Sequence, residues 1–244
     1  MTTPAPVTAS LGPAESVSAV LFDLDGTLAD TLPDLVAALD LALAEHGVGP
    51  LGPDRARALV TAGSRAMVSA GLGPGVSAAR FEAVLDRFLA AYRADIAERT
   101  RLFTGTEAVL DALESAGTRW GVVTSKPAWL TEPLLDALGL LRRAVCVVSG
   151  DSVTNPKPHP EPLLLGARLA ACAPADCVYV GDALPDVRAA RAAGMRSVVA
   201  LYGYGSAQTD PHTWGADAYV RSTAELGALL APLAHRSRGA GRTV

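Results

Sequence analysis

Short apolar runs recur along the second half of the chain, and segments with helical spacing of apolar residues separate them. From Gly105 onwards the pattern predicts helices at residues 106–116, 130–138, 160–171 and 185–193 and again after Thr223. The apolar runs between them predict strands at residues 120–124, 145–148, 178–180, 197–201 and 219–220. Strands that alternate with helices along a chain form a parallel sheet covered by helices on both faces. With Val20-Leu21-Phe22 as the first strand, the pattern predicts an α/β fold with a Rossmann-like parallel sheet.

The stretch between the first strand and Gly105 has apolar residues at helical spacing only. Residues 33–46 predict one helix, and residues 51–75 contain Gly and Pro around a short helical piece. A long amphipathic helix then follows Ser77, which is a predicted N-cap. The predicted domains are an all-helical insertion at residues 33–101 and an α/β core at residues 17–32 and 102–234.

Composition excludes several classes of partner. The 244 residues allow one large domain with a small accessory one. A formal net charge of -4 and a pI near 5.6 give no basic footprint for nucleic acid. No stretch approaches the roughly 18 apolar residues that a membrane span needs. We therefore expect neither nucleic acid nor a membrane as a partner.

The ends of the chain and the cysteines indicate its compartment. Residues 1–16, rich in Pro, Ala, Thr and Ser, predict a disordered leader, and residues 235–244 predict a disordered tail. The first basic residue is Arg55, so the N-terminus lacks the positive start of a targeting peptide. The three cysteines have neither metal-ligand spacing nor an even count. These features predict a cytoplasmic protein.

Asp23-Leu24-Asp25-Gly26-Thr27 directly follows the first apolar run and is the most informative segment of the chain. Ligands of an open α/β sheet bind at such strand ends. Two carboxylates placed there, one residue apart, repel each other unless a cation lies between them. A hard divalent metal ion or a lysine ammonium could be that cation. Alternatively, Asp-Gly is a common turn, and Asp23 could cap a helix.

Lysine is rare in this chain. Of 21 basic residues, only Lys126 and Lys157 are lysines, and each lies next to a proline. A lysine ammonium is a compact point charge, whereas an arginine guanidinium is a planar fork. A chain that keeps lysine at only two places is expected to need an ammonium there.

Four polar clusters follow four predicted strands. They are Asp23 with Asp25, Thr124-Ser125-Lys126, Lys157, and Asp182 with Asp186. The ends of parallel strands lie on one edge of a sheet, so these residues can converge. Carboxylates for a metal, a hydroxyl and an ammonium together suit a phosphoryl group. Each cluster also has a structural alternative: the hydroxyls could cap the following helix, Lys126 could be solvated, and Asp186 could stabilise its own helix.

The four motifs in this order resemble the haloacid dehalogenase superfamily of phosphohydrolases, over about residues 18–232. The helical insertion is similar to the small cap domain of that family. Within the superfamily, Gly-Val-Val-Thr-Ser-Lys-Pro and Tyr202-Gly-Tyr204 are most similar to the phosphoglycolate phosphatases. The chain departs from the usual family motifs at two positions that are not expected to take part in the reaction. Thr104 occurs where Pro-Gly is usual, and Ala183 occurs where serine is common.

The resemblance implies an Mg²⁺-dependent phosphomonoesterase. Asp23 would be the nucleophile that forms an aspartyl-phosphate, and Asp25 would be the general acid and base. Asp23, the backbone carbonyl of Asp25, and Asp182 would hold the Mg²⁺.

The remaining motif residues would contact the phosphate or its surroundings. Thr124 and backbone amides would hold phosphate oxygens, with Ser125 and Lys126 as further substrate-binding residues. Lys157 would neutralise charge in the transition state, and Asp186 would orient it.

The substrate implied first is 2-phosphoglycolate, for which Arg65 in the Gly-rich bend 61–65 could clamp the carboxylate. Arg65 could equally be a solvated helix residue. Alternative functions are a phosphatase of a sugar or sugar-acid phosphate, such as N-acetylmuramic acid 6-phosphate, a phosphosugar mutase, or a phosphorylated receiver module. We expect a monomer or a homodimer that acts on a small phosphorylated metabolite.

Overall fold

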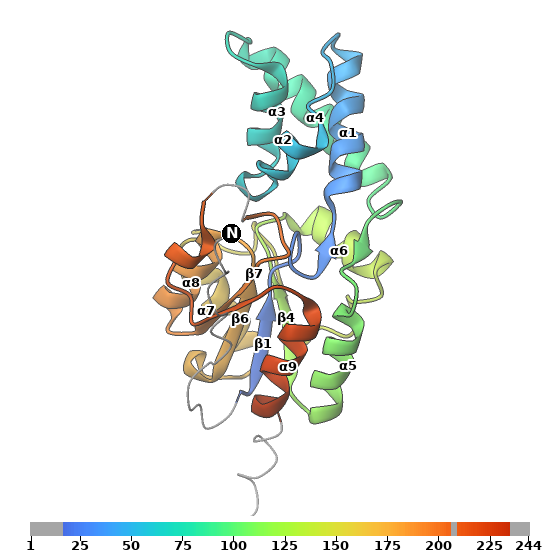
Figure 1. Cartoon of the computed structure of the whole chain (residues 1–244). Helices are drawn as coiled ribbons and strands as arrows, with labels where there is room; N and C mark the ends of the chain where they lie inside the picture. Colours follow the sequence, from blue (N-terminus) through green and yellow to red (C-terminus); the bar gives the residue numbers. More distant parts are fainter. Residues whose placement is uncertain (1–16, 206–208, 235–244) are drawn as a thin grey trace, which may run out of the picture.

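The structure, a computed structural model, describes residues 17–205 and 209–234 (Figure 1). Six strands form one sheet in the order β5-β4-β1-β6-β7-β8, and all neighbouring strands are parallel. Their bounds are β1 Ala19–Phe22, β4 Arg119–Val123, β5 Val147–Val148, β6 Cys177–Gly181, β7 Arg196–Ala200 and β8 Ala218–Val220. The predicted α/β fold is therefore confirmed. The predicted leader at 1–16 and tail at 235–244 lie outside the described residues.

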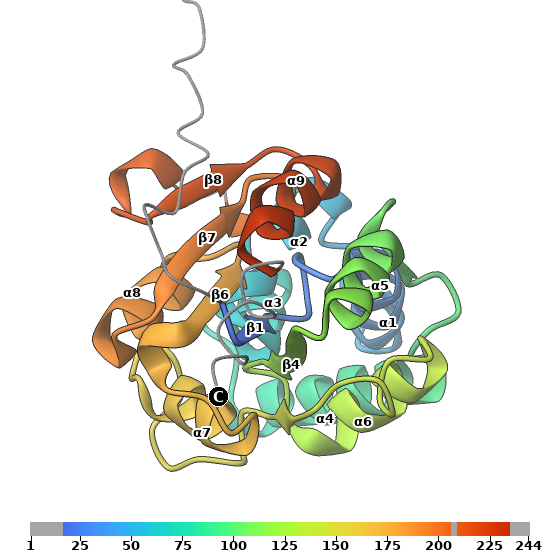
Figure 2. The same cartoon turned by 90° about the horizontal axis from the view of Figure 1, so that it is seen from below.

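Helices cover both faces of this sheet (Figure 2). Helices α5 (Thr106–Ala116) and α9 (Thr223–Ala234) pack on one face, and α7 (Glu161–Leu169) and α8 (Leu184–Ala193) pack on the other. Successive side chains of β1 enter opposite hydrophobic clusters, with Val20 and Phe22 on the α5 side and Leu21 on the α7 side. Because both faces are buried, the central strands contain continuous apolar runs instead of alternating ones.

Most elements match the predicted positions, and the differences are local. The predicted strand at residues 145–148 is shortened to β5, although Val145 N still donates to Trp120 O of β4 at 2.9 Å. Helix α6 spans Ala128–Ala137, so it begins two residues and ends one residue earlier than predicted. Helix α5 ends at Gly117, whose φ of 75° is a left-handed conformation that glycine adopts without steric cost.

Four α-helices and a 3₁₀ helix form a separate layer beyond the carboxyl edge of the sheet, which we call the cap (Figure 1). They are α1 Leu32–Glu45, α2 Pro53–Arg57, η1 Val60–Ala62, α3 Ser64–Leu72 and α4 Ala78–Ala94. The cap has its own hydrophobic cluster, in which Leu39 and Phe88 are fully buried. The Ser77 hydroxyl accepts a hydrogen bond from Arg80 N at 3.3 Å, as predicted for an N-cap. The prediction of a single helical piece between residues 51 and 75 is wrong, because this stretch holds two α-helices and the 3₁₀ helix.

A two-stranded antiparallel ribbon, β2 (Ala29–Asp30) with β3 (Arg101–Leu102), joins the cap to the core. Asp34 in the first turn of α1 is 4 % exposed and ties the outgoing chain to the returning chain. Its carboxylate accepts hydrogen bonds from Thr100 N at 2.8 Å, Thr100 Oγ1 at 2.7 Å and Arg99 N at 3.0 Å. Strands of two residues are too short to show a period, so the sequence pattern did not predict this ribbon.

Replacing Asp34 with alanine is expected to destabilise the junction between cap and core. Buried backbone donors would lose their acceptor, and each such loss costs about 1–3 kcal/mol. We expect Asp34→Ala to lower the free energy of unfolding by at least about 2 kcal/mol in urea titrations, and Asp34→Asn to lower it less because its amide oxygen still accepts. Equal stability of Asp34→Ala and the unchanged protein would contradict this role.

Candidate active site

The predicted residues of the core follow β1, β4, β5 and β6, and most of them line one cavity of about 270 Å³ beneath the cap. Asp182 is not among the residues that line this cavity. Asp23 directly follows β1, and its backbone N–H donates to Val180 O of the adjacent strand β6 at 2.8 Å. Thr124 directly follows β4 and Asp182 directly follows β6. The core residues that line the cavity include Asp23, Asp25, Thr124, Ser125, Lys126 and Lys157.

Lys157 lies between two carboxylates. Its Nζ is 2.7 Å from Asp186 Oδ1 and 3.2 Å from Asp23 Oδ1, and it also donates to the Tyr179 hydroxyl at 3.0 Å. Burial alone would lower the pKa of Lys157, but Asp186 and Asp23 outweigh it and hold that pKa above its ordinary value. Lys157 is therefore a charged, fixed group beside Asp23.

Asp186 both pairs with Lys157 and stabilises the start of its own helix, the two roles that its sequence position allowed. Its Oδ1 pairs with Lys157, and its Oδ2 accepts from Ala183 N at 3.0 Å at the start of α8. The two contacts hold the carboxylate in one orientation. Asp186 therefore orients Lys157 while it caps its own helix.

Asp182 is held by the loop that follows β7. Its Oδ2 accepts from Tyr204 N at 2.7 Å and Gly205 N at 3.1 Å, while Thr27 Oγ1 lies 3.3 Å from Oδ1. A side chain at Gly26, where φ is 82°, would have its Cβ 2.5 Å from the Asp182 carboxylate. Glycine is thus required at position 26 both for its backbone conformation and for this close approach.

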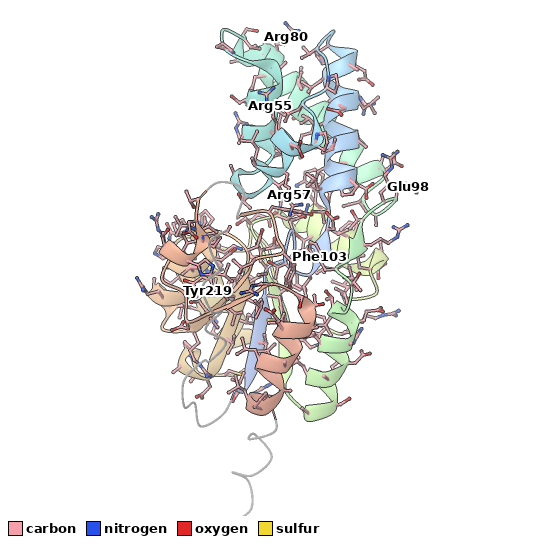
Figure 3. The ribbon with its side chains drawn as sticks, in the orientation of Figure 1. Arg55, Arg57, Arg80, Glu98, Phe103 and Tyr219 are labelled. Carbon is pink, nitrogen blue, oxygen red and sulfur yellow. The ribbon has the colours of Figure 1, made fainter. Side chains whose placement is uncertain are left out.

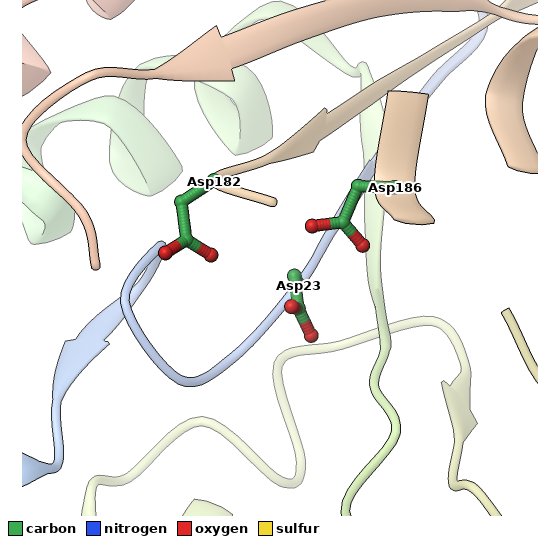
Figure 4. Close-up of side chains that lie close together, drawn as sticks. All are labelled: Asp23, Asp182 and Asp186. Atoms are coloured by element: carbon green, nitrogen blue, oxygen red, sulfur yellow. The ribbon is translucent and has the colours of Figure 1, made fainter. Parts of the chain in front are cut away.

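Carboxylates of Asp23, Asp182 and Asp186 converge (Figure 4), each with an oxygen within 4.8 Å of the others. Burial, together with the neighbouring carboxylates, raises the pKa of Asp182 to about 8 and that of Asp23 to about 6. With all three ionised, Lys157 would be the single ammonium among them, which leaves two negative charges uncompensated. The Asp25 side chain is not part of this cluster.

Asp25 and Lys126 form a second ion pair nearby. Lys126 Nζ is 3.2 Å from Asp25 Oδ1 and donates to the Tyr92 hydroxyl of α4 at 3.0 Å. The Lys126 side chain is only 7 % exposed, so it is not a solvated surface residue. The Thr124 hydroxyl accepts from Lys126 N at 3.3 Å within this loop and does not cap α6.

The cap wall of the cavity is largely neutral. It includes Val60, Thr61, Ser64, Met67, Leu89 and Tyr92. Of the described residues that line the cavity, only Lys126 and Lys157 are basic.

The geometry does not support the predicted clamp by Arg65. The bend before it lines the cavity, but Arg65 forms a bidentate pair with Glu82 at 2.7 and 3.1 Å and is not in the lining. Its guanidinium also lies 4.7 Å from the centre of the Phe81 ring. On helix α3, position 65 faces α4, where Glu82 supplies the carboxylate, and the Arg65 side chain is 62 % exposed.

Sequence reasoning assigned no role to the tyrosines that brace the site. The Tyr204 hydroxyl donates to Asp30 Oδ1 at 2.6 Å and accepts from Thr31 N at 2.8 Å, so it holds the start of the cap. Arg57, at the base of the cap in Figure 3, donates to Gly203 O at 2.6 Å, and its guanidinium lies 5.0 Å from the centre of the Tyr204 ring. The Tyr202-Gly-Tyr204 segment carries part of the family resemblance, but nothing in its local pattern indicates these long-range contacts.

Of the helices in the described residues, none combines the length and apolar character of a membrane span.

Comparison with known proteins identifies the family. The family model of the haloacid dehalogenase-like hydrolases matches residues 20–200. A phosphoglycolate phosphatase of Xylella fastidiosa is 44 % identical over 201 residues, which is 82 % of this chain and 87 % of that protein. An N-acetylmuramic acid 6-phosphate phosphatase of Pseudomonas putida is 40 % identical over 208 residues, 85 % of this chain and 93 % of that protein.

The fold comparison agrees. The crystal structure of a predicted phosphoglycolate phosphatase from Haemophilus somnus has a TM-score of 0.81 and 25 % identity, covering 88 % of this chain and 98 % of that one. The family model matches most of the chain, and both phosphatase relatives match along most of their own length. The chain belongs to the haloacid dehalogenase-like hydrolase family.

Proposed function

We propose that this protein is a divalent-cation-dependent phosphomonoesterase in which Asp23 becomes transiently phosphorylated. The observation that carries the proposal is the position of Asp23, beside the Lys157 ammonium and the Asp182 carboxylate, with Asp25 two residues further on. This arrangement combines a nucleophile, fixed positive charge and a second carboxyl group in a covered cavity. The phosphatase names of the relatives support it.

The acidic cluster fits a hard cation. Its donors are carboxylate oxygens, which Mg²⁺ prefers, and with all three carboxylates ionised it carries two negative charges more than Lys157 neutralises. We infer that Asp23, Asp182 and the backbone carbonyl of Asp25 hold Mg²⁺, while Asp186 stays paired with Lys157. Bound there, the cation would reduce the repulsion between Asp23 and a phosphate dianion.

In the first half of the reaction, a carboxylate oxygen of Asp23 attacks phosphorus while the bond to the leaving alkoxide breaks. Asp25, which must be protonated when this step begins, gives its proton to that alkoxide, which departs as a neutral alcohol. Lys157 and the Thr124 hydroxyl stabilise the charge on the transferring phosphoryl group.

In the second half, water hydrolyses the aspartyl-phosphate. Asp25, now a carboxylate, accepts a proton from the water as it attacks phosphorus. The bond between phosphorus and Asp23 breaks, which releases inorganic phosphate and restores Asp23 as a carboxylate. Each residue thus returns to its starting protonation state.

The substrate we propose first is 2-phosphoglycolate, the substrate in the name of the Xylella fastidiosa relative. A sugar-acid phosphate is the second candidate, because the neutral cap wall with Val60, Met67 and Leu89 offers apolar contacts to a larger group. A cytoplasmic location and a monomeric or homodimeric state remain predictions.

Replacement of Asp23 by asparagine is expected to abolish phosphate release from every phosphomonoester, because an amide cannot serve as the nucleophile. The fold should persist, since the amide oxygen of the new side chain can still accept from Leu24 N, as Asp23 Oδ1 does at 2.8 Å. Release of inorganic phosphate and far-ultraviolet circular dichroism check both statements. Substantial turnover by a folded Asp23→Asn variant would refute the proposed function.

Substitution of Arg65 by alanine is expected to leave KM for 2-phosphoglycolate unchanged, because its guanidinium pairs with Glu82 outside the cavity lining. Steady-state assays of the variant test this, and the same assays with N-acetylmuramic acid 6-phosphate rank the two candidate substrates by kcat/KM. An increase in KM of about tenfold, or about 1.4 kcal/mol, would instead support binding of the substrate carboxylate by Arg65.

The stability of the cation-free protein is expected to fall as pH rises. Asp182 has a pKa of about 8 in the folded state against an ordinary value of 3.8, so between these values the folded state binds more protons than the unfolded state. Mg²⁺ competes with those protons and binds only the folded state, so its stabilising effect should grow over the same range.

Melting temperatures measured at pH 6 and pH 8, near which Asp23 and Asp182 titrate, test this expectation. Added Mg²⁺ should raise the melting temperature more at the higher pH, and Asp182→Asn should remove most of that difference. An equal Mg²⁺ effect at both values would contradict the assignment of the cluster as a cation site.

A further inference from the structure

Lys126 connects the core to the cap through a single buried ammonium. It belongs to the loop that follows β4, and its Nζ is 3.2 Å from Asp25 Oδ1 on the loop after β1. The same Nζ donates to the hydroxyl of Tyr92, on cap helix α4, at 3.0 Å and lies 4.4 Å from the centre of that ring. A buried lysine with these two partners is placed to transmit the position of the cap to Asp25.

The contacts to Asp25 distinguish its two carboxyl oxygens. Oδ1 accepts from Thr31 Oγ1 at 2.6 Å and also faces the Lys126 ammonium. Within the described residues, Asp25 Oδ2 has no hydrogen-bond partner. An oxygen that already faces two donors has little capacity for a proton, so a proton on Asp25 belongs on Oδ2.

The cap side of the link is equally constrained. Tyr92 is 1 % exposed and belongs to the hydrophobic cluster of the cap, so its hydroxyl moves only with α4. Lys126 is fixed from the core side as well, because its backbone N–H donates to Thr124 Oγ1 and its carbonyl accepts from Thr131 Oγ1 at 3.0 Å. The ammonium therefore makes both contacts only when α4 is seated over this loop.

We propose that Lys126 is a positioning residue that, held by Tyr92 of the seated cap, fixes Asp25 Oδ1 and so directs the proton on Oδ2 to the leaving oxygen. The proposal rests on the proposed function, in which Asp25 is the general acid. It gives Lys126 a role other than the substrate contact expected from the sequence. Proton transfer then becomes efficient only under a docked cap, which covers the site from water.

The proton step itself is balanced. As the bond between phosphorus and the leaving oxygen breaks, that oxygen takes the proton from Asp25 Oδ2, and the phosphoryl group bonds to Asp23. Lys126 keeps all its protons throughout. The loss on removing Lys126 should therefore depend on how strongly the leaving group requires a proton.

The experiment compares Lys126→Met with the unchanged enzyme on two substrates. Glycerol phosphate has an alkoxide leaving group that requires protonation, whereas p-nitrophenolate leaves as a stable anion. We expect Lys126→Met to lower kcat/KM for glycerol phosphate by about tenfold or more, as for partial loss of general acid catalysis, and to change kcat/KM for p-nitrophenyl phosphate little. Because kcat/KM reports the steps up to Asp23 phosphorylation, slow hydrolysis of the intermediate does not mask the effect.

Tyr92→Phe tests the cap half of the link independently. It removes only the hydroxyl and keeps the ring, so folding is preserved even if Lys126→Met fails to fold. It should show the same selective loss with glycerol phosphate, to a smaller degree, because Lys126 still faces Asp25. Arg87→Met is the matched control, because it also removes a cation from an ion pair on the helix that carries Tyr92. Arg87 pairs with exposed Glu45 at 2.7 Å, so its loss should change kcat/KM for neither substrate.

A double-mutant cycle with Asp25→Asn identifies the residue through which Lys126 acts. If Lys126 works through Asp25, then Lys126→Met should cause no further selective loss in the Asp25→Asn background. Additive losses would overturn the proposal.

Equal losses on both substrates would also overturn the proposal, and so would a rise in KM confined to 2-phosphoglycolate, which would make Lys126 a substrate ligand. If Asp25→Asn alone shows no leaving-group selectivity, the general-acid step of the proposed function fails. Selectivity in Asp25→Asn without selectivity in Lys126→Met or Tyr92→Phe rejects the Lys126 link alone.

Discussion

Charge balance at the carboxyl edge of the sheet is the constraint on which the site depends. Four aspartates, Asp23, Asp25, Asp182 and Asp186, gather there, and carboxylates removed from water are stable only beside positive charge or hydrogen-bond donors. The chain supplies both of its lysines for this purpose, one to each side of Asp23-Leu24-Asp25. The compact Lys157 ammonium fits between Asp23 and Asp186, where a planar guanidinium would require more room.

The parallel sheet makes that concentration of charge possible. Strands β1, β4 and β6 are neighbours, so the residues directly after them emerge side by side although they lie far apart in the chain. The backbone is also used where side chains cannot reach: two amides of the loop after β7 hold Asp182, and Gly26 leaves space for its carboxylate. The remaining negative charge is what suits the cluster to a divalent cation and to phosphoryl chemistry.

The cap forms one wall of the cavity without adding charge to it. Its lining residues are apolar or carry hydroxyls, and its arginines make contacts elsewhere: Arg65 with Glu82, Arg87 with Glu45, and Arg57 with the loop that contains Tyr204. Discrimination among phosphate esters would therefore come from shape and neutral contacts. The cap is linked to the chemistry at two points, through Tyr204 at its base and through Tyr92 and Lys126 over the site.

The sequence alone determined the α/β class and the helical insertion, and it located the motif residues that meet at the carboxyl edge of the sheet, because these features depend on local patterns. Helix 106–116 was predicted to the residue, since its apolar period and Gly117 are both local signals. The strand ends after β1, β4 and β6 could be inferred to converge because the pairing of parallel strands brings those ends to one edge. Only the tertiary structure decided which residues each charged side chain contacts. Arg65 turned to Glu82, Lys126 joined Asp25 to Tyr92, and the two-residue ribbon and Asp34 closed the junction, because each choice depends on distances between helices and loops that no local pattern contains.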